Sequence, residues 1–394
     1  MAWTLTGTTR ARAFFTAAFL ASALLSLGAA SAGVIPDFGF DFVTIGDTGN
    51  PAWPGGKYGQ TAGRGSVDYQ YRMAKLEVSS AQWLEFINIF APQSDNPGTF
   101  LRPNTSGLRQ VTGQPGAYFL NPYVDNAGEL PVLGINWREA AMYVNWLNND
   151  KATDWSAIQS GAYDVSTFTQ NADGTFNDQL THDPGARFWI PTLDEWLKAA
   201  HWDPNKNGEG EGGWWEYPGM SDEPLTPGEP GEGQTSAGLS ASDGANIIPL
   251  GSYPDTPSPW GLLDTSGGAA EWTEEAIGEL GLIARALGGA WAGSDQFALD
   301  FFDSIDTING LRPTFPFDGG LRIASAIPSP TGPALADLNH DGVVNGADLG
   351  TLLVNWGPCD QVRSACPADF NNDTIVDAAD LMDILANWGL VGSR

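Results

Sequence analysis

Apolar residues recur at helical spacing near the C-terminal end of the chain. Two series occupy positions i, i+3, i+4 and i+7, namely Leu349, Leu352, Leu353 and Trp356, and then Leu381, Ile384, Leu385 and Trp388. This spacing predicts two helices that are apolar on one side. Because neither short helix can bury its apolar stripe alone, we expect the two to pack on each other.

The longer N-terminal part predicts three further helices among aromatic-rich segments. The segment from Tyr71 changes from strand-like alternation to a helix capped by Ser79 or Ser80. A second helix starts after Asn136, with Ala140, Ala141, Val144 and Leu147 on one side. From Arg187 an extended arm ends at Pro191, and a third helix is capped by Thr192 with Glu195 three residues later.

The first residues predict a signal peptide covering residues 1–32. Arg10 and Arg12 precede an apolar run from Ala13 to Leu27, and residues 30–32 are small, as a cleavage site requires. A membrane anchor is the alternative, but the run is shorter than the roughly 20 apolar residues that cross a bilayer. We therefore expect a secreted protein, extracellular or periplasmic, with no membrane span.

Composition points to a loop-rich globular body with an acidic surface. The 394 residues include 16 tryptophans, 49 glycines and 27 prolines, which favours a core wrapped by irregular loops. The formal net charge of −29 argues against a nucleic-acid partner, whose phosphates would be repelled. This charge favours calcium as a partner, although outside the C-terminal region we read the acidity as a source of solubility.

A proline-rich linker, residues 328–336, divides the body at 33–327 from a tail at 337–389 that contains an internal repeat. DLNHDGVVNGADLGTLLVNWG begins at Asp337 and DFNNDTIVDAADLMDILANWG begins at Asp369, so the period is 32 residues. Each repeat places oxygen ligands at the spacing of an EF-hand loop. The first set is Asp337, Asn339, Asp341, Val343 through its carbonyl, Asn345 and Asp348, and the second is Asp369, Asn371, Asp373, Ile375 through its carbonyl, Asp377 and Asp380.

We expect two Ca²⁺ ions in these loops, since closely spaced acidic residues repel one another without a cation. Gly342 occupies the sharp-turn position of the first loop, whereas Thr374 stands there in the second, which predicts a more strained second site. Cys359 and Cys366, the only cysteines, are expected to form a local disulfide. Without nearby histidines, they fall short of the four ligands of a structural zinc site.

The tail resembles type I dockerin, a family of paired calcium loop and helix units, over residues 337–389. The resemblance implies docking onto a cohesin-type or other cell-surface protein, often in polysaccharide-degrading assemblies. Its partner-reading positions would be Gly346-Ala347 and Ala378-Ala379, which offer little side chain to a partner. A calcium-stabilised terminal module without a cohesin partner therefore stays open as the alternative.

The body resembles the formylglycine-generating enzyme, or sulfatase-modifying factor, family. Residues 131–148 and 187–200 are similar to its PVxxVSWxDAxAYxxWL and RLPTEAEWExAAR patterns, Gly289-Ala290-Trp291 stands at its GGSW, and Gly320-Leu321-Arg322 at its GFR. The resemblance implies a loop-rich α+β fold related to C-type lectins. With the tail, the expected fold class is an α+β body followed by a small all-α calcium module.

The resemblance also implies copper-dependent oxidation by two cysteines, which this body lacks. The corresponding stretch from Trp291 to Gly320 contains no cysteine, so we expect neither copper binding nor oxidase activity. The calcium-site turn of the family, GNVWEW, is altered, because Gly268 replaces the asparagine while Glu271 and Trp272 remain. His182 and His201 do not make a facial triad of iron ligands by themselves.

Two classes of function follow from these patterns. In the favoured one, the body is a non-catalytic relative that binds a protein or a glycan, and Trp214, Trp215 and Tyr217 line an exposed aromatic platform. In the alternative, the body is an active formylglycine-generating-type oxidoreductase or a component of a polysaccharide-degrading assembly. A carboxylate hydrolase stays open too, although no spacing selects a catalytic pair.

Overall fold

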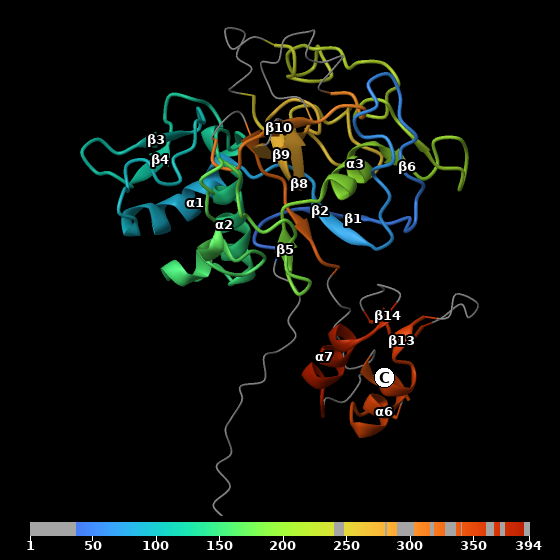
Figure 1. Ribbon diagram of the computed structural model, residues 1–394. Coiled ribbons are helices and arrows are strands. Elements are labelled where there is room, and N and C mark those ends of the chain that lie inside the picture. Colours follow the sequence, from blue (N-terminus) through green and yellow to red (C-terminus); the bar gives the residue numbers. More distant parts are fainter. Residues whose placement is uncertain are drawn as a thin grey trace, which may run out of the picture.

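The computed structural model describes residues 37–239, 248–279, 282–289, 303–315, 319–327, 336–339, 341–359, 366–370 and 375–389 (Figure 1). The expected signal peptide lies outside these ranges, as do Ala290, Trp291, Asn371, Asp373 and Thr374. Among the helices of the described residues, none is long and apolar enough to cross a bilayer.

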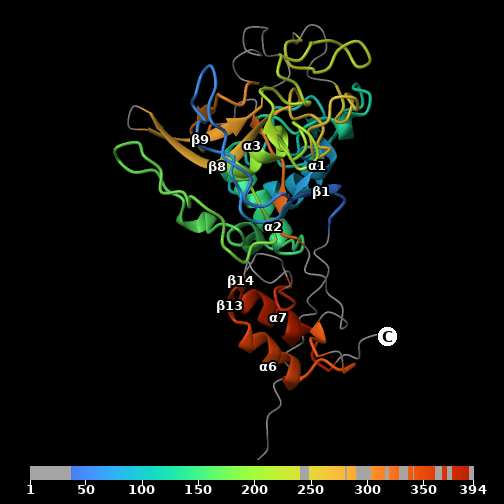
Figure 2. The same ribbon diagram turned by 90° about the vertical axis from the view of Figure 1, so that its right-hand side faces the viewer.

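The body contains two four-stranded sheets built from segments far apart in the sequence (Figures 1 and 2). The first sheet is antiparallel, with strand order β1-β2-β12-β5. Its strands are β1 (Phe42–Ile45), β2 (Tyr71–Ala74), β12 (Ala324–Ser325) and β5 (Phe188–Trp189). Since β12 pairs with both β2 and β5, the end of the body is held between its beginning and its middle.

The second sheet has strand order β10-β9-β8-β11. Its strands are β10 (Asn309–Leu311), β9 (Leu282–Gly288), β8 (Ala270–Glu279) and β11 (Gly319–Gly320). β8 and β9 are antiparallel with a register shift between Trp272 and Ala276, whereas β11 runs parallel to β8. Two smaller ladders join β3 (Leu108–Gln110) to β4 (Tyr118–Leu120) and β6 (Trp202–Asp203) to β7 (Gly213–Trp214).

Three helices among the described residues of the body begin where the sequence predicts them. They are α1 (Ser80–Phe90), α2 (Trp137–Asn148) and α3 (Leu193–His201). Each starts with a capping box, formed by Ser79 with Gln82, Asn136 with Glu139, and Thr192 with Glu195. These reciprocal bonds satisfy backbone N–H groups that the first turn of a helix leaves free. Short 3-10 turns follow at η1 (Ala91–Gln93), η2 (Ala127–Glu129), η3 (Trp155–Ile158) and η4 (Val165–Thr167).

The core of the body is largely aromatic. The predicted inner face of α2, formed by Ala140, Ala141, Val144 and Leu147, is buried together with Trp83, Tyr143 and Trp146. α2 packs beside β5, and α3 lies against β8 and β9. The body is therefore a loop-rich mixed α and β fold, as expected.

The tail contains α6 (Gly346–Val354), β13 (Gly357–Pro358), β14 (Ile375–Val376) and α7 (Ala378–Ala386), which group together in Figures 1 and 2. The two helices contact each other over a small core that includes Val344, Leu352, Phe370 and Ile384. The expectation of an all-α tail is wrong, because β13 and β14 form an antiparallel ladder. Backbone groups of residues 357–358, shortly after α6, find partners in residues 375–376.

Only part of the predicted apolar stripe on these helices is buried. Leu352 and Ile384 are fully buried, but four other members of the stripe remain about half exposed, namely Leu353, Trp356, Leu385 and Trp388. A helix pair this short covers one side of each partner, and the outer edge of each stripe stays in contact with solvent.

Candidate functional site

A buried ion pair occupies the start of β8. Glu271 of β8 accepts hydrogen bonds from Nε of Arg322 at 3.0 and 2.9 Å and from Nη2 at 2.6 Å. The remaining guanidinium hydrogens reach the carbonyls of Ala74 and Lys75 from Nη1, and those of Leu263 and Asp264 from Nη2. The five donors of Arg322 are thus all used within this cluster.

Glu77 lies between β2 and α1 and belongs to the same buried cluster. Its side chain is buried, and Oε1 accepts a hydrogen bond from the amide of Ala269 at 2.7 Å. Oε2 is buried without a hydrogen-bond partner among the described residues. Burial and the negative charge of Glu271 raise the pKa of Glu77 well above its usual value. A carboxyl group is therefore held where its charge is poorly compensated.

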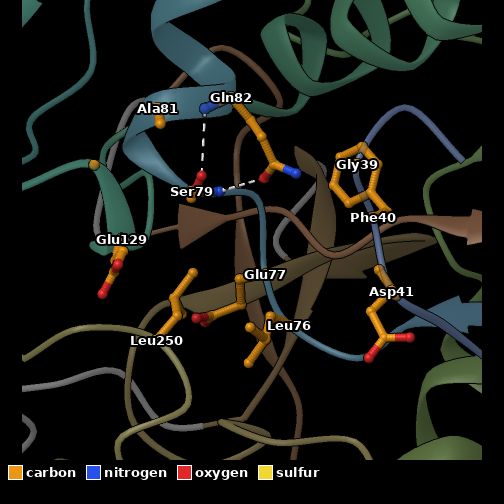
Figure 3. Close-up of a pocket in the computed structure, with 12 residues that line it drawn as sticks. Gly39, Phe40, Asp41, Leu76, Glu77, Ser79, Ala81, Gln82, Glu129 and Leu250 are labelled. Atoms are coloured by element: carbon orange, nitrogen blue, oxygen red, sulfur yellow. Dashed lines mark hydrogen bonds between the residues drawn. The ribbon is translucent and has the colours of Figure 1, made fainter. Parts of the chain in front are cut away.

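A cavity of about 520 Å³ lies beside Glu77 (Figure 3). Its apolar walls come from Phe40, Ala74, Leu76, Ala81 and Leu250, and its acidic groups are Asp41, Glu77 and Glu129. Glu77 was missed in the sequence reading, although a single acidic residue between Leu76 and Val78, directly before a helix cap, is a signal that could have drawn attention to it.

The turn before β8 does not offer Glu271 as a free metal ligand. Beside its bonds to Arg322, Oε2 of Glu271 accepts the indole Nε1–H of Trp196 at 2.6 Å. Gly268, at the position of the family's asparagine, has a positive φ of 59° and adds no side-chain oxygen. We therefore assign no calcium ion to this turn.

The two histidines of the body have separate surroundings. His201, at the end of α3, is buried, and its Nδ1 lies 3.2 Å from the carbonyl oxygen of Trp215. His182 stacks on Trp189 and its Nδ1 lies 2.9 Å from Oε1 of Glu274. In the described ranges, neither histidine belongs to a group of three or more metal-ligating side chains.

The expected aromatic platform at Trp214, Trp215 and Tyr217 is wrong. Trp214 and Tyr217 are only 8% and 4% exposed, and Trp215 is partly buried. Trp214 packs edge-on against Trp53 and Trp202, and its indole N–H donates to the carbonyl of Pro51 at 3.0 Å. The pairing of β6 with β7 turns this ring into a second small core instead of toward solvent.

The first loop of the tail is folded around two acidic side chains. Asp337 accepts the amides of Asp341 and Gly342 at 3.0 and 2.7 Å. Asp348 accepts those of Asn339 and Asn345 at 3.2 and 2.8 Å, and both aspartates are buried. Gly342 has a φ of 95°, as the sharp turn at this position requires.

The second loop repeats part of this arrangement. Asp380 is buried and accepts the amides of Phe370 and Asp377 at 2.6 and 2.9 Å. Asp369 follows Cys366 closely, and Asn371 and Asp373 lie outside the described residues. The two loops therefore share an acid at the last ligand position that binds the loop's own backbone.

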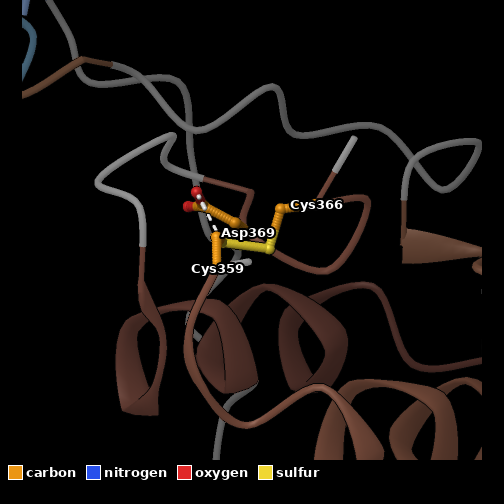
Figure 4. A group of neighbouring side chains, drawn as sticks. All are labelled: Cys359, Cys366 and Asp369. Carbon is orange, nitrogen blue, oxygen red and sulfur yellow. Dashed lines mark hydrogen bonds between the residues drawn. A yellow bond between two sulfur atoms is a disulfide. The ribbon is translucent and has the colours of Figure 1, made fainter. Parts of the chain in front are cut away.

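Cys359 and Cys366 form a disulfide, and Asp369 lies beside it (Figure 4). This is the only group of three or more histidine, cysteine or acidic side chains with ligand atoms within 4.8 Å of one another that the described residues contain. Because the two sulfur atoms are bonded to each other, no thiolate is available for a metal there.

Three solved structures are similar to this chain. In the solved structures, the chain is similar to Treponema denticola variable protein 1, with 16% identity and a TM-score of 0.43, over 73% of this chain and 95% of that one. It is also similar to CarF, with 19% identity and a TM-score of 0.42, over 75% of this chain and all of that one. A third is PvdO from Pseudomonas aeruginosa, with 15% identity and a TM-score of 0.38, over 73% and 91% of the two chains.

No curated protein matches this chain at a significant level. Residues 54–324 match the sulfatase-modifying factor enzyme 1-like domain, and this range contains both sheets of the body apart from β1 and the last residue of β12. The chain therefore belongs to the family of sulfatase-modifying factor enzyme 1-like domains.

Proposed function

We propose that this is a secreted modular protein in which the body acts as a binding module and the tail binds two calcium ions to attach the body to an extracellular partner. The observation that carries the proposal is the first loop of the tail. Its backbone amides are bound by Asp337 and Asp348, which leaves further lone pairs of these carboxylates for a cation.

The donor set fits calcium. Carboxylates of Asp337, Asp341 and Asp348, the side-chain oxygens of Asn339 and Asn345, and the carbonyl of Val343 are all hard oxygen ligands in a flexible loop. The equivalent residues of the second loop are Asp369, Asn371, Asp373, Ile375, Asp377 and Asp380. Calcium bound there would neutralise the loop acids and hold each loop against its helix.

The exposed apolar side chains of the tail support attachment to a partner. Leu353 and Trp356 on the α6 side are 53% and 48% exposed, and Leu385 and Trp388, 32 residues later, are 49% and 47% exposed. Exposed apolar side chains that gather in one place mark interaction surfaces, and tryptophan is enriched among the residues that contribute most of the binding energy there. Such a surface provides the side chains that the small residues at 346–347 and 378–379 lack.

The cysteine inventory supports a body without oxidase activity. The chain has two cysteines, and both belong to the disulfide of the tail. No thiolate of the body is then available to hold copper(I). The disulfide is also consistent with an oxidising compartment outside the cytoplasm.

A calcium titration of the full chain tests the tail. Calorimetry should give about two ions per chain, and hydrogen exchange over residues 337–389 should slow when calcium is added. An Asp337→Ala and Asp369→Ala double variant should lose both effects, whereas Asp173→Ala, which removes a fully exposed acid of the body, should keep them. Equal protection of the tail in EDTA and in calcium would contradict the proposal.

A separate assay tests the body. Purified protein supplied with copper and a cysteine-containing peptide should consume no oxygen and form no formylglycine. Formation of formylglycine in a co-expressed sulfatase peptide would overturn the non-catalytic assignment.

A further inference from the structure

The cavity beside Glu77 is not used by the proposed function of the tail. It lies where β2 ends and α1 begins, and Glu129 of η2 and Leu250 also line it (Figure 3). At about 520 Å³ it is large enough for a small organic molecule. Its walls are mainly apolar, so a ligand would gain from burying a hydrocarbon part there.

The polar groups of this cavity are acidic. Asp41, Glu77 and Glu129 line it, and none of its described lining residues is lysine, arginine or histidine. At the start of α1, the amide of Ser79 donates to Oε1 of Gln82, and Oγ of Ser79 accepts the amide of Gln82. The charge of the cavity therefore favours a cation.

One carboxylate oxygen of Glu77, Oε2, has no hydrogen-bond partner among the described residues, whereas Oε1 accepts the amide of Ala269. Arg322, the nearby cation, donates its hydrogens to Glu271 and to backbone carbonyls, and among the described residues it forms no hydrogen bond with Oε2. The glycine at 268 leaves room for this carboxyl, since a methyl group there would lie 2.5 Å from Oε2. In Figure 3 the carboxyl points toward Leu250, on the wall of the cavity.

We propose that this cavity binds an organic cation, a primary ammonium group on an apolar body. The ammonium donates to Oε2 of Glu77, and the apolar body lies against Phe40, Leu76 and Leu250. A single buried carboxylate oxygen without a hydrogen bond among the described residues suits the point-like ammonium better than a guanidinium, whose planar fork matches two oxygens. It is also too few ligands for calcium, which takes six to eight oxygens.

Two kinds of ligand carry such an ammonium group, a free alkylamine and a peptide with a lysine side chain. Calorimetry on the full chain in calcium at neutral pH should therefore compare hexylammonium, a capped Gly-Lys-Gly peptide, hexanol and hexanoate. Saturable binding of hexylammonium or of the peptide supports the proposal, and the tighter of the two identifies the source. Hexanol and hexanoate should bind at least about tenfold more weakly, because they cannot form the charged hydrogen bond.

Variants connect the binding to Glu77. Glu77→Gln should weaken the binding of the cationic probe at least about tenfold, and Glu209→Gln, which changes an exposed acid on another loop, should leave it unchanged. If Glu77→Gln does not fold, Leu250→Trp, which fills the cavity from a partly exposed position, should abolish binding with an unaltered melting temperature. Absence of saturable binding, equal affinity for hexanol, or unchanged binding in both cavity variants would overturn the proposal.

Discussion

Glu271 and Arg322 form an ion pair that is almost completely removed from solvent, with Oε1 and Nη2 2.6 Å apart and side chains 1% and 0% exposed. The pair joins β8 to the segment that leads into β12, and Arg322 also binds carbonyls at the end of β2 and near Leu263. It therefore links both sheets of the body. Breaking such a pair by removing one partner leaves an uncompensated buried charge.

We expect Arg322→Met to lower the free energy of unfolding by about 3–5 kcal/mol, because Glu271 would remain buried without its cation. Urea unfolding followed by tryptophan fluorescence measures this loss. The control is Lys151→Met, which breaks an ion pair with half-exposed Glu85 and should cost no more than about 1 kcal/mol. Equal losses in the two variants would contradict a special role for the buried pair.

His201 should make the body sensitive to acid. Burial lowers the pKa of His201 from 6.5 to about 3, although its hydrogen bond to the carbonyl of Trp215 opposes the shift. Since the unfolded chain takes up the proton first, the stabilisation is present above pH 6.5 and is lost as pH falls from 6.5 toward 3. The slope attributable to this one group is at most about 1.4 kcal/mol per pH unit.

His201→Gln should remove that slope while keeping a hydrogen-bond donor. Unfolding free energies of the parent and the variant at pH 7 and pH 5 give the comparison, and the difference between the two proteins should shrink or change sign at the lower pH. A difference that is independent of pH would show that His201 is protonated equally easily in the folded and the unfolded states.

The helix starts of the body could be predicted from sequence because capping is local. Thr192 and Glu195, three residues apart, contain the whole signal for α3, and the same holds for Asn136 and Glu139 at α2. The sheets could not be predicted in this way. Strands of two residues, such as β5 and β12, are defined by partners more than a hundred positions away. They are too short to show a periodic pattern of their own.

The same difference between local and long-range signals separates the site residues that could be predicted from those that could not. The acids of the first tail loop could be predicted from the sequence, because all ligand positions of an EF-hand loop lie within one short stretch of the chain. The lone oxygen of Glu77 depends on Ala269 and Arg322, which approach it only in the folded body. Trp214 was misread because its neighbours Trp53 and Trp202 come from separate segments, and a tryptophan among glycines gives no sign of them.

Trp214→Ala tests whether that ring belongs to the core. Removing a buried tryptophan should cost about 3–5 kcal/mol of unfolding free energy, because it leaves a cavity beside Trp53 and Trp202. Tyr123→Ala, which removes a ring that is 81% exposed, is the control and should change stability by less than about 0.5 kcal/mol. A Trp214→Ala protein of unchanged stability that had lost glycan binding would contradict the assignment of this ring to the core.

Reduction of the disulfide should weaken the tail and spare the body, because Cys359 and Cys366 are both in the tail. A disulfide that closes a loop of this length lowers the conformational entropy of the unfolded tail, which stabilises the folded tail by about 2 kcal/mol. We expect the Cys359→Ser and Cys366→Ser double variant to speed hydrogen exchange over residues 337–389 at limiting calcium, while exchange in α2 and α3 stays the same. Saturating calcium should recover much of the lost protection, since an ion that binds only the folded tail stabilises it in proportion to the logarithm of its concentration. If calcium gave no recovery, the disulfide and the loops would not be stabilising the same folded unit.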